Sequence, residues 1–162
     1  MIIREETPED ASAVRKVVEA AFARTAEADL VEALRDAGDG VMSLVAEVGG
    51  ELAGHILFSK LQAPDRCIAL APVSVTPSRQ NQGIGSMLIR EGLARAKRDG
   101  WQAVFLLGEP EYYRRFGFSV EAAAKFETEY PKAYFMARAL VGRALEERAG
   151  AVVYAPPFQA LG

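Results

Sequence analysis

The sequence predicts a mixed α/β domain, and three patterns along the chain support this fold class. Apolar residues recur at helical spacing between residues 14 and 22. On both sides of Gly49-Gly50 they alternate with other residues, which is typical of a β-hairpin. Farther along, residues 67–75 form a nearly continuous apolar run, the pattern of a strand that is buried on both faces. Together these patterns predict one domain, residues 1–162, with elements in the order βααβββαβαβ and a final strand.

The N-terminal quarter of the chain is predicted to hold a short strand and two helices. After the strand, the letters TPED mark a helix start. Thr7 stands at the N-cap position, Pro8 at the first helical position and Asp10 where a capping-box partner belongs. The second helix is predicted over residues 28–37. The apolar face of the first helix consists of Val14, Val17, Val18, Ala21 and Phe22.

The middle of the chain is predicted to form the hairpin, the buried strand and a long helix. The hairpin strands cover residues 42–48 and 52–58. Pro72 lies inside the buried strand, and because proline donates no backbone hydrogen bond we expect a bulge or bend there. The helix has two cations in its last turn and Gly100 just beyond it. Every fourth residue contributes to its apolar face: Ile84, Leu88, Gly92 and Ala96.

The last third of the chain gives fewer signals. A buried strand is predicted at residues 103–107, followed by a short helix that starts at Pro110 and stops at Gly117. Beyond this point the patterns are weaker. The one strand that can be placed there covers residues 151–154, just before two prolines.

Size and composition narrow the class of protein. The chain has 162 residues and a mass of 17.5 kDa, enough to bury the core of one ordinary domain. Its formal net charge of −3 gives no electrostatic reason to expect a nucleic-acid partner. Because the chain has a single cysteine, an internal disulfide is excluded. It also has a single histidine, so we expect no metal centre of nitrogen and sulfur ligands. The sequence shows no secretory leader and no apolar stretch that could span a bilayer, so we expect a cytoplasmic protein without a membrane partner.

Two glycines, Gly83 and Gly85, stand one residue apart at the predicted start of the long helix. Free N–H groups at a helix start attract anions, and glycine lets a phosphate approach the backbone closely. Two common phosphate motifs do not fit, because the Walker loop needs a lysine after its glycine and the dinucleotide fingerprint needs a third glycine where Leu88 stands. A nucleotide-binding protein is therefore nearly excluded. A purely structural role for the two glycines, in turning the chain, stays an alternative.

The letters around these glycines resemble the acyl-CoA signature of the GNAT superfamily of N-acetyltransferases. In VTPSRQNQGIG the signature Q/R-x-x-G-x-G/A is met by Gln80, Gly83 and Gly85. A second block, YYRRFGF, is similar to the family's Y-x-x-x-G-F ending. The first tyrosine of that pattern corresponds to Tyr113. The order of the predicted elements also resembles that of the family. The run LGEPEYYRRFGF is most similar to the YhbS-like branch.

This resemblance implies a mostly antiparallel sheet with splayed central strands, flanked by helices, and acetyl-CoA as the acyl donor. The pantetheine arm would lie in the gap and contact backbone groups of Val73, Ser74 and Val75. Many relatives carry an asparagine where Leu106 stands, so that family contact to the pantetheine arm is not expected here. The pyrophosphate would rest on backbone N–H groups of one turn: Gln80, Asn81, Gln82, Gly83, Ile84, Gly85 and Ser86.

The resemblance also implies direct transfer of an acetyl group to a primary amine of a small molecule or a protein. A backbone N–H near Val75 would polarise the thioester carbonyl. Tyr113 occupies the family's general-acid position, from which it would protonate the departing thiolate; the alternative is an aromatic ring that only covers the coenzyme. Tyr112 is expected to pack or to line the substrate site. The acceptor and the oligomeric state stay open, although relatives often form homodimers.

No general base can be assigned from the sequence, and a water relay is an alternative. His55 is one candidate, although a lone histidine on a strand is more typical of a structural residue. The carboxylate candidates are Glu47, Glu51, Glu109 and Glu111. Arg114 and Arg115 either reach a coenzyme phosphate or face solvent. Acids in segments where relatives build the acceptor site hint at a cationic substrate: Glu27, Asp29, Glu127 and Glu129.

Because the base is unplaced and the family asparagine is missing, a second class of function stays open. A non-catalytic acyl-CoA sensor or regulatory module would keep the coenzyme-binding turn and lack the chemistry. It would bind coenzyme A tightly and would be indifferent to a change at Tyr113.

Overall fold

A computed structural model describes residues 1–161 of the chain as two compact units. The first unit consists of residues 1–59, 71–92 and 156–161, and the second of residues 60–70 and 93–155. The strand β4 (Cys67–Val75) and the helix α3 (Ile84–Arg98) contribute residues to both. The prediction of one domain over residues 1–162 stays a prediction, and Gly162 lies outside the described residues.

The strands of the first unit are antiparallel. β1 (Ile2–Glu5) pairs with β2 (Gly40–Val48), and β2 pairs with β3 (Glu51–Lys60). The hairpin turn at Gly49 and Gly50 has φ angles of 59° and 83°, a left-handed conformation that glycine adopts freely, and this confirms the predicted hairpin. The end of β4 joins β3 through the Thr76 N–H, which donates to the Ala53 carbonyl at 2.8 Å.

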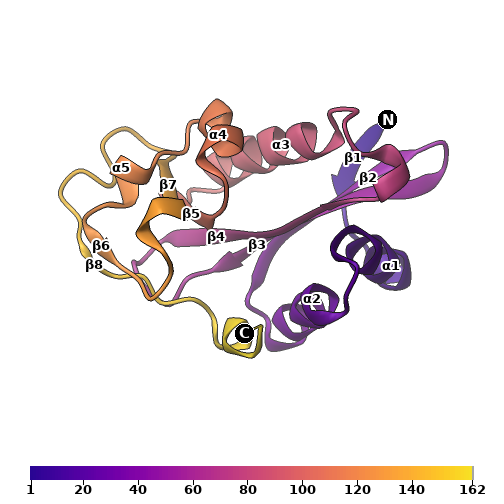
Figure 1. Cartoon of the computed structure of the whole chain (residues 1–162), viewed down its shortest axis with the longest axis horizontal. Helices are drawn as coiled ribbons and strands as arrows, with labels where there is room; N and C mark the ends of the chain where they lie inside the picture. Colours follow the sequence, from indigo (N-terminus) through magenta and orange to yellow (C-terminus); the bar gives the residue numbers. More distant parts are fainter. Residues whose placement is uncertain (162) are drawn as a thin grey trace. The chain divides into compact units, whose positions relative to one another are not determined.

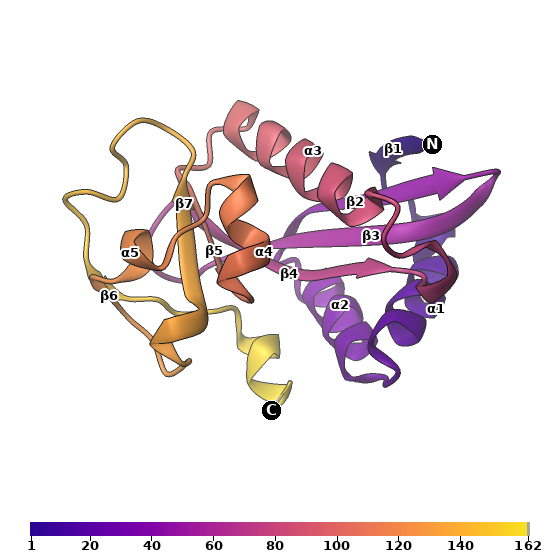
Figure 2. The same cartoon turned by 45° about the horizontal axis from the view of Figure 1, so that its top comes forward.

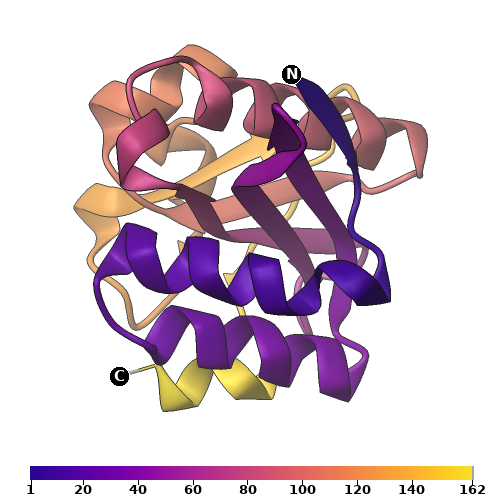
Figure 3. The same cartoon turned by 90° about the vertical axis from the view of Figure 1, so that its right-hand side faces the viewer.

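Two helices cover one face of these strands and α3 covers the other (Figure 1). The 3-10 helix η1 (Pro8–Asp10) leads into α1 (Ala11–Phe22), and the Asp10 carboxylate accepts from the Thr7 N–H at 2.7 Å, as the capping prediction requires. α2 (Ala26–Ala37) begins two residues earlier than predicted. Figure 3 shows α1 and α2 side by side, with the C-terminal 3-10 helix η5 (Pro156–Ala160) beside α2. Buried aliphatic side chains line this face: Val14, Val17, Val18, Leu30, Val31 and Leu34.

The α3 helix approaches β3 closely because glycines stand at the contact points. A Cβ atom on Gly54 would lie 2.9 Å from Leu88 Cδ1, and one on Gly92 would lie 2.4 Å from Phe58 Cε2. The Phe58 ring is completely buried, so it has no free space into which to move. Gly92 therefore belongs to the packing between helix and strand, although it lies within a helix where glycine is ordinarily unfavourable.

Replacing Gly92 by alanine is expected to lower the free energy of unfolding by about 2 kcal/mol, the usual scale of overpacking. In an exposed helix the same change would raise stability by about 1 kcal/mol, so the sign distinguishes the two situations. Urea unfolding measures the effect. In a Phe58→Leu background, where the ring is absent, Gly92→Ala should lower the free energy of unfolding by less than it does in the parent protein. A Gly92→Ala protein as stable as the parent would contradict the close packing of Gly92 against Phe58.

The second unit is built on three paired strands. The first residues of β4 pair in parallel with β5 (Ala103–Leu107), from Cys67–Ala103 to Ala69–Phe105. β5 pairs antiparallel with β7 (Phe135–Ala139) along its whole length. The bounds of β4 and β5 are those that the sequence predicts. The register with β5 is complete before Pro72, which follows a cis peptide bond. Figure 2 shows β5 and β7 in this unit.

Short elements complete the second unit (Figure 2). α4 (Pro110–Tyr113) and the 3-10 helix η3 (Arg114–Phe116) form the predicted short helix, which ends at Gly117 with φ 87°. α5 (Val120–Ala123) and the two-residue strands β6 (Phe126–Glu127) and β8 (Gly150–Ala151) follow. The predicted strand at 151–154 is therefore wrong in extent, since only its first residue lies in β8 and Val153 makes an isolated bridge to Ala63. The sequence did not locate β7.

Aromatic rings and one cysteine form the core of the second unit. The Phe105 ring packs edge-on against Phe126 at 5.0 Å and stacks on Phe135 at 5.7 Å between ring centroids. Cys67 is completely buried beside them, and burial raises the pKa of its thiol. The Arg148 guanidinium lies 3.8 Å from the Cys67 sulfur and donates to the Asp65 carbonyl at 2.9 Å. Within residues 1–161, no helix is both long and apolar enough to cross a bilayer.

Candidate functional site

The glycine turn, residues 80–86, connects the end of β4 to α3 in the first unit. The 3-10 helix η2 (Pro77–Arg79) precedes it, and the Gln80 side chain reaches back to donate to the Val75 carbonyl at 3.0 Å. Asn81 and Gly83 both have left-handed backbones, with φ angles of 64° and 84°. Alternation between left-handed and other conformations turns successive N–H groups toward one side, the arrangement of an anion nest.

The first turn of α3 supplies further donors at the same place. Met87 N–H donates to the Gly83 carbonyl at 3.1 Å, so the helical hydrogen bonds begin there. The N–H groups of Ile84, Gly85 and Ser86 precede this bond and have no acceptor within the helix, and the helix dipole adds positive character to them. A Cβ on Gly83 would meet no atom within 4 Å, so the turn is open on that side. These residues fit a bound pyrophosphate.

The predicted pantetheine segment forms the end of β4. Val73 and Val75 are half-buried, while Ser74 between them is only 2% exposed. The Ser74 hydroxyl has no hydrogen-bond partner among the described residues, although an unpaired buried hydroxyl is costly. The carbonyl of Val75 is already engaged by Gln80.

Tyr113 closes α4 in the second unit. Its ring lies edge-on to Tyr112, at 5.0 Å, and to Phe118, at 6.1 Å between ring centroids. Burial, and to a smaller extent the neighbouring Tyr112, raises the pKa of Tyr113 to about 12. The structure records no hydrogen bond of the Tyr113 hydroxyl to any residue of 1–161. A hydroxyl that stays protonated at neutral pH and keeps its hydrogen bonds free can serve as a proton donor.

The residues around Tyr113 differ in what they can offer a ligand. The Arg115 guanidinium lies 4.8 Å from the centre of the Tyr112 ring, a cation–π contact that gives this arginine a structural partner. Leu106 is buried, with 1% of its surface exposed. Arg114, Glu109 and Glu111 are exposed.

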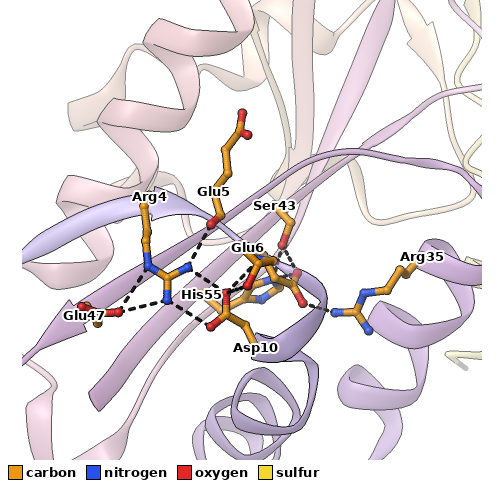
Figure 4. Close-up of polar contacts among 9 residues, drawn as sticks. Arg4, Glu5, Glu6, Asp10, Arg35, Ser43, Glu47 and His55 are labelled. Carbon is orange, nitrogen blue, oxygen red and sulfur yellow. Dashed lines mark hydrogen bonds and ion pairs between the residues drawn. The ribbon is translucent and has the colours of Figure 1, made fainter. Parts of the chain in front are cut away.

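Two base candidates of the first unit, Glu47 and His55, belong to separate polar networks, which Figure 4 shows together. In one, the Arg4 guanidinium lies between Glu47, at 3.0 Å, and Asp10, at 2.7 Å. The two acids hold the pKa of Arg4 above its usual value, and Arg4 and the Thr7 backbone hold that of Asp10 below its own. Glu47 is thus engaged in an ion pair, while Glu51 is exposed.

The other network surrounds His55. Ser43 Oγ lies 2.8 Å from His55 Nε2 and donates to the Glu6 carboxylate, which also pairs with Arg35 (Figure 4). Because the serine proton goes to Glu6, the neutral imidazole carries its proton on Nε2 and donates it to Ser43. His55 Nδ1 is then a bare acceptor, with no hydrogen-bond partner among the described residues. Burial and the positive charge of Arg35 lower the pKa of His55 to about 3.

The depressed pKa of His55 predicts acid-sensitive folding. The unfolded chain protonates this side chain near pH 6.5, whereas the folded chain resists protonation until about pH 3, so protons favour unfolding between these values. Stability is full above about pH 6.5 and falls as the pH decreases, by up to about 1.4 kcal/mol per pH unit for one proton. Urea unfolding at pH 7.0, 6.0 and 5.0 measures this slope. His55→Gln, which does not titrate, should have the smaller slope; equal slopes in the two proteins would contradict the prediction.

Other predicted acids also have partners. The Glu27 carboxylate is only 7% exposed and pairs with Arg24, while Asp29 pairs with Arg15 at 2.9 Å. Glu127 and Glu129 are exposed in the second unit. Residues 1–161 contain no cluster of three or more His, Cys, Asp or Glu side chains that could hold a metal ion.

Cavities lie beside both networks among the described residues of the first unit. One of 640 Å³ separates α1 from the β2–β3 hairpin and extends to Thr76, close in sequence to the glycine turn. Another, of 480 Å³, lies beside Glu6, Ser43 and Arg35.

The sequence predicts no role for Gly108 and does not reveal its contact with Tyr113. A Cβ on this glycine would lie 2.4 Å from Tyr113 Cε2. No motif in the sequence signals this contact, because it depends on how α4 folds back against the end of β5.

Comparisons with known proteins agree on one family. Residues 11–118 match the acetyltransferase (GNAT) family. The N-acetyltransferase YhbS of Escherichia coli strain K12 is 34% identical, over 98% of this chain and 98% of its own. The crystal structure of E. coli YhbS in complex with CoA superimposes with a TM-score of 0.94 at 33% identity, covering 99% of this chain and 93% of that one.

A second solved structure is also similar, that of a GNAT family acetyltransferase from Brucella melitensis in complex with acetyl-CoA. It has a TM-score of 0.83 and 41% identity, with 97% of each chain covered. The resemblance to the YhbS-like branch is thus confirmed, as is the mixed fold with a mostly antiparallel sheet flanked by helices. The chain belongs to the GNAT family of acetyltransferases.

Proposed function

We propose that the protein is an acetyl-CoA-dependent N-acetyltransferase that transfers an acetyl group directly to a primary amine. Family membership makes the chain an acyltransferase, and the YhbS and Brucella melitensis structures compared above contain CoA and acetyl-CoA, respectively. The observation that carries the proposal is the open glycine turn, where left-handed Gly83 precedes three helix-start N–H groups without helical acceptors. We also propose that residues 1–162 act as one domain, because the family match extends over parts of both units.

In this proposal the glycine turn binds the pyrophosphate and the end of β4 binds the pantetheine arm. Backbone amides hold the phosphates, since no lysine or arginine occurs between residues 80 and 89. Ser74 adds a buried hydroxyl whose hydrogen bonds are unused in the described chain. Val73 and Val75 contribute backbone groups, one of which polarises the thioester carbonyl.

The reaction joins the amine nitrogen to the acetyl carbonyl carbon and breaks the bond from that carbon to sulfur. The ammonium group of the acceptor must first lose a proton to solvent to become nucleophilic, and its nitrogen loses another as the amide forms. The coenzyme leaves as a thiolate that must gain a proton. Tyr113 donates the proton that the thiolate gains, because a tyrosine hydroxyl is protonated at neutral pH and the structure records no hydrogen-bond partner for this one within residues 1–161; the tyrosinate then regains a proton from solvent. His55 is an unsuitable base, since a buried imidazole with a pKa of about 3 binds protons too weakly.

Two measurements test this function. Calorimetry with coenzyme A and with acetyl-CoA tests the binding, and release of free thiol from acetyl-CoA in the presence of a panel of primary amines tests the transfer. We expect both ligands to bind and thiol release to require an amine. Tight binding without transfer to any amine would instead favour an acyl-CoA sensor, and absence of binding would contradict both.

A further inference from the structure

The Tyr113 ring lies against the backbone at Gly108, the first residue after β5. A Cβ on Gly108 would be 2.4 Å from Tyr113 Cε2 and 2.8 Å from Cδ2. Ordinary contacts to a Cβ begin at about 3.4 Å, so any side chain larger than hydrogen would displace this ring by about 1 Å. The backbone of Gly108 does not itself require glycine, because its φ angle lies outside the left-handed region that the other turn glycines occupy. The ring contact is therefore what excludes a side chain.

Hydrogen bonds fix both partners of this contact. The Gly108 N–H donates to the Tyr134 carbonyl at 2.9 Å, which ties the glycine to the residue before β7. The Tyr113 N–H donates to the Glu109 carbonyl at 3.0 Å, which closes the single turn of α4 over Gly108. The ring cannot retreat freely on its other sides, because Tyr112 and Phe118 lie edge-on to it.

A second contact fixes the far end of the same segment. Arg138 on β7 donates from Nη1 to the Phe116 carbonyl at 2.8 Å, at the end of η3. Its guanidinium also lies beside Gly117, where a Cβ would be 3.1 Å from Arg138 Nε. α4 and η3 are thus attached to β5 at one end and to β7 at the other, with Tyr113 between the attachments.

We propose that Gly108 and Arg138 are positioning residues that set the location of the Tyr113 hydroxyl for proton donation. The proposal rests on the proposed function of Tyr113. A displacement of about 1 Å matters because proton donation needs hydrogen-bond reach, and a misplacement of this size costs up to about 100-fold in rate. Gly108 positions the Tyr113 ring because it has no side chain that would displace the ring. Arg138 positions the segment by its hydrogen bond to the Phe116 carbonyl.

The test is a double-mutant cycle on kcat for acetyl transfer, with Gly108→Ala, Tyr113→Phe and the double variant. Gly108→Ala should lower kcat about 10- to 100-fold with little change in KM for acetyl-CoA. In the Tyr113→Phe background, which keeps the ring and lacks the hydroxyl, the same change should have no further effect on kcat. Gly40→Ala is a matched control, because Gly40 has no left-handed φ and its Cβ would touch only the flexible end of Leu57.

A purely structural role would give a different result. Gly108→Ala would then lower kcat by the same factor in both backgrounds, and this outcome, like an unchanged kcat, overturns the proposal. If Gly108→Ala does not fold, Arg138→Met takes its place in the same cycle, with the same expectation and the same contrary outcome.

A readout without catalysis separates this proposal from the proposed function. Tyrosinate absorbance between pH 9 and 11, corrected by subtraction of the Tyr113→Phe spectrum, follows Tyr113 alone. In the parent protein the Tyr113 hydroxyl should stay largely protonated over that range, whereas in Gly108→Ala the displaced, better hydrated ring should lose its proton within it.

If Tyr113→Phe leaves kcat unchanged, the acid role fails, and the role of Gly108 in catalysis fails with it. If Tyr113→Phe lowers kcat but Gly108→Ala changes neither kcat nor the titration, only the positioning role fails.

Discussion

Replacing Tyr113 by phenylalanine is expected to lower kcat about 100-fold, the lower end of what a positioned proton donor contributes. The ring would still fill the space against Gly108, Tyr112 and Phe118, so folding and coenzyme binding should change little. The effect should therefore appear in kcat and not in KM for acetyl-CoA, because the hydroxyl acts on a charge that develops only as the thiolate leaves. Thiol release at saturating acetyl-CoA measures kcat.

Tyr112→Phe is the control for this experiment. It removes the same atom from the adjacent residue, whose ring is engaged by Arg115 and by the Tyr113 edge. Its kcat should stay within about twofold of the parent, since a change that touches no reacting atom costs little. A Tyr113→Phe enzyme with the parent's kcat would show that the thiolate takes its proton from elsewhere.

Replacing Gly83 by alanine is expected to weaken coenzyme A binding at least tenfold, which corresponds to about 1.4 kcal/mol. For alanine, the left-handed φ of 84° at this position costs about 1–2 kcal/mol. If the turn relaxes, its N–H groups no longer converge. If it does not relax, the new methyl group stands in the space that is now open beside Gly83. Calorimetry measures the affinity in either case.

Gly50→Ala is a closely matched control for Gly83→Ala. Gly50 has a φ of 83°, and its Cβ too would meet no atom within 4 Å, but it lies in the β2–β3 hairpin turn. Both substitutions should therefore cost similar stability in urea unfolding, while only Gly83→Ala should weaken coenzyme binding. Equal affinities in the two variants would mean that the glycine turn does not bind the coenzyme.

The strands and helices that the sequence predicts well are those whose signals are local. β4 and β5 have the predicted bounds because their apolar runs end at clear breakers, and α3 ends before Gly100, whose φ is 92°. β7 was missed because Phe135–Ala139 is short and contains Arg138, and its strand conformation depends on pairing with β5. The tail beyond Ala139 is held by scattered contacts from distant segments, such as Val153 with Ala63, which no local pattern reveals.

The candidate site shows the same division. Gly83 and Tyr113 could be identified because they belong to family motifs that a short stretch of sequence displays. The protonation state of His55 could not be predicted, because it depends on residues from three other places in the chain: Glu6, Arg35 and Ser43. The role of Gly108 is likewise invisible in sequence, since what matters is the ring that lies where its side chain would be.

The seclusion of Cys67 also has a practical use. Thiolates, and not protonated thiols, attack disulfide reagents, and this sulfur is both shielded from solvent and kept in its unreactive protonated form. With no other cysteine in the chain, colour development with such a reagent should report coenzyme release alone while the protein is native. When the second unit unfolds, the Cys67 sulfur becomes accessible to the reagent. The denaturant concentration at which labelling begins would therefore show where that unit unfolds.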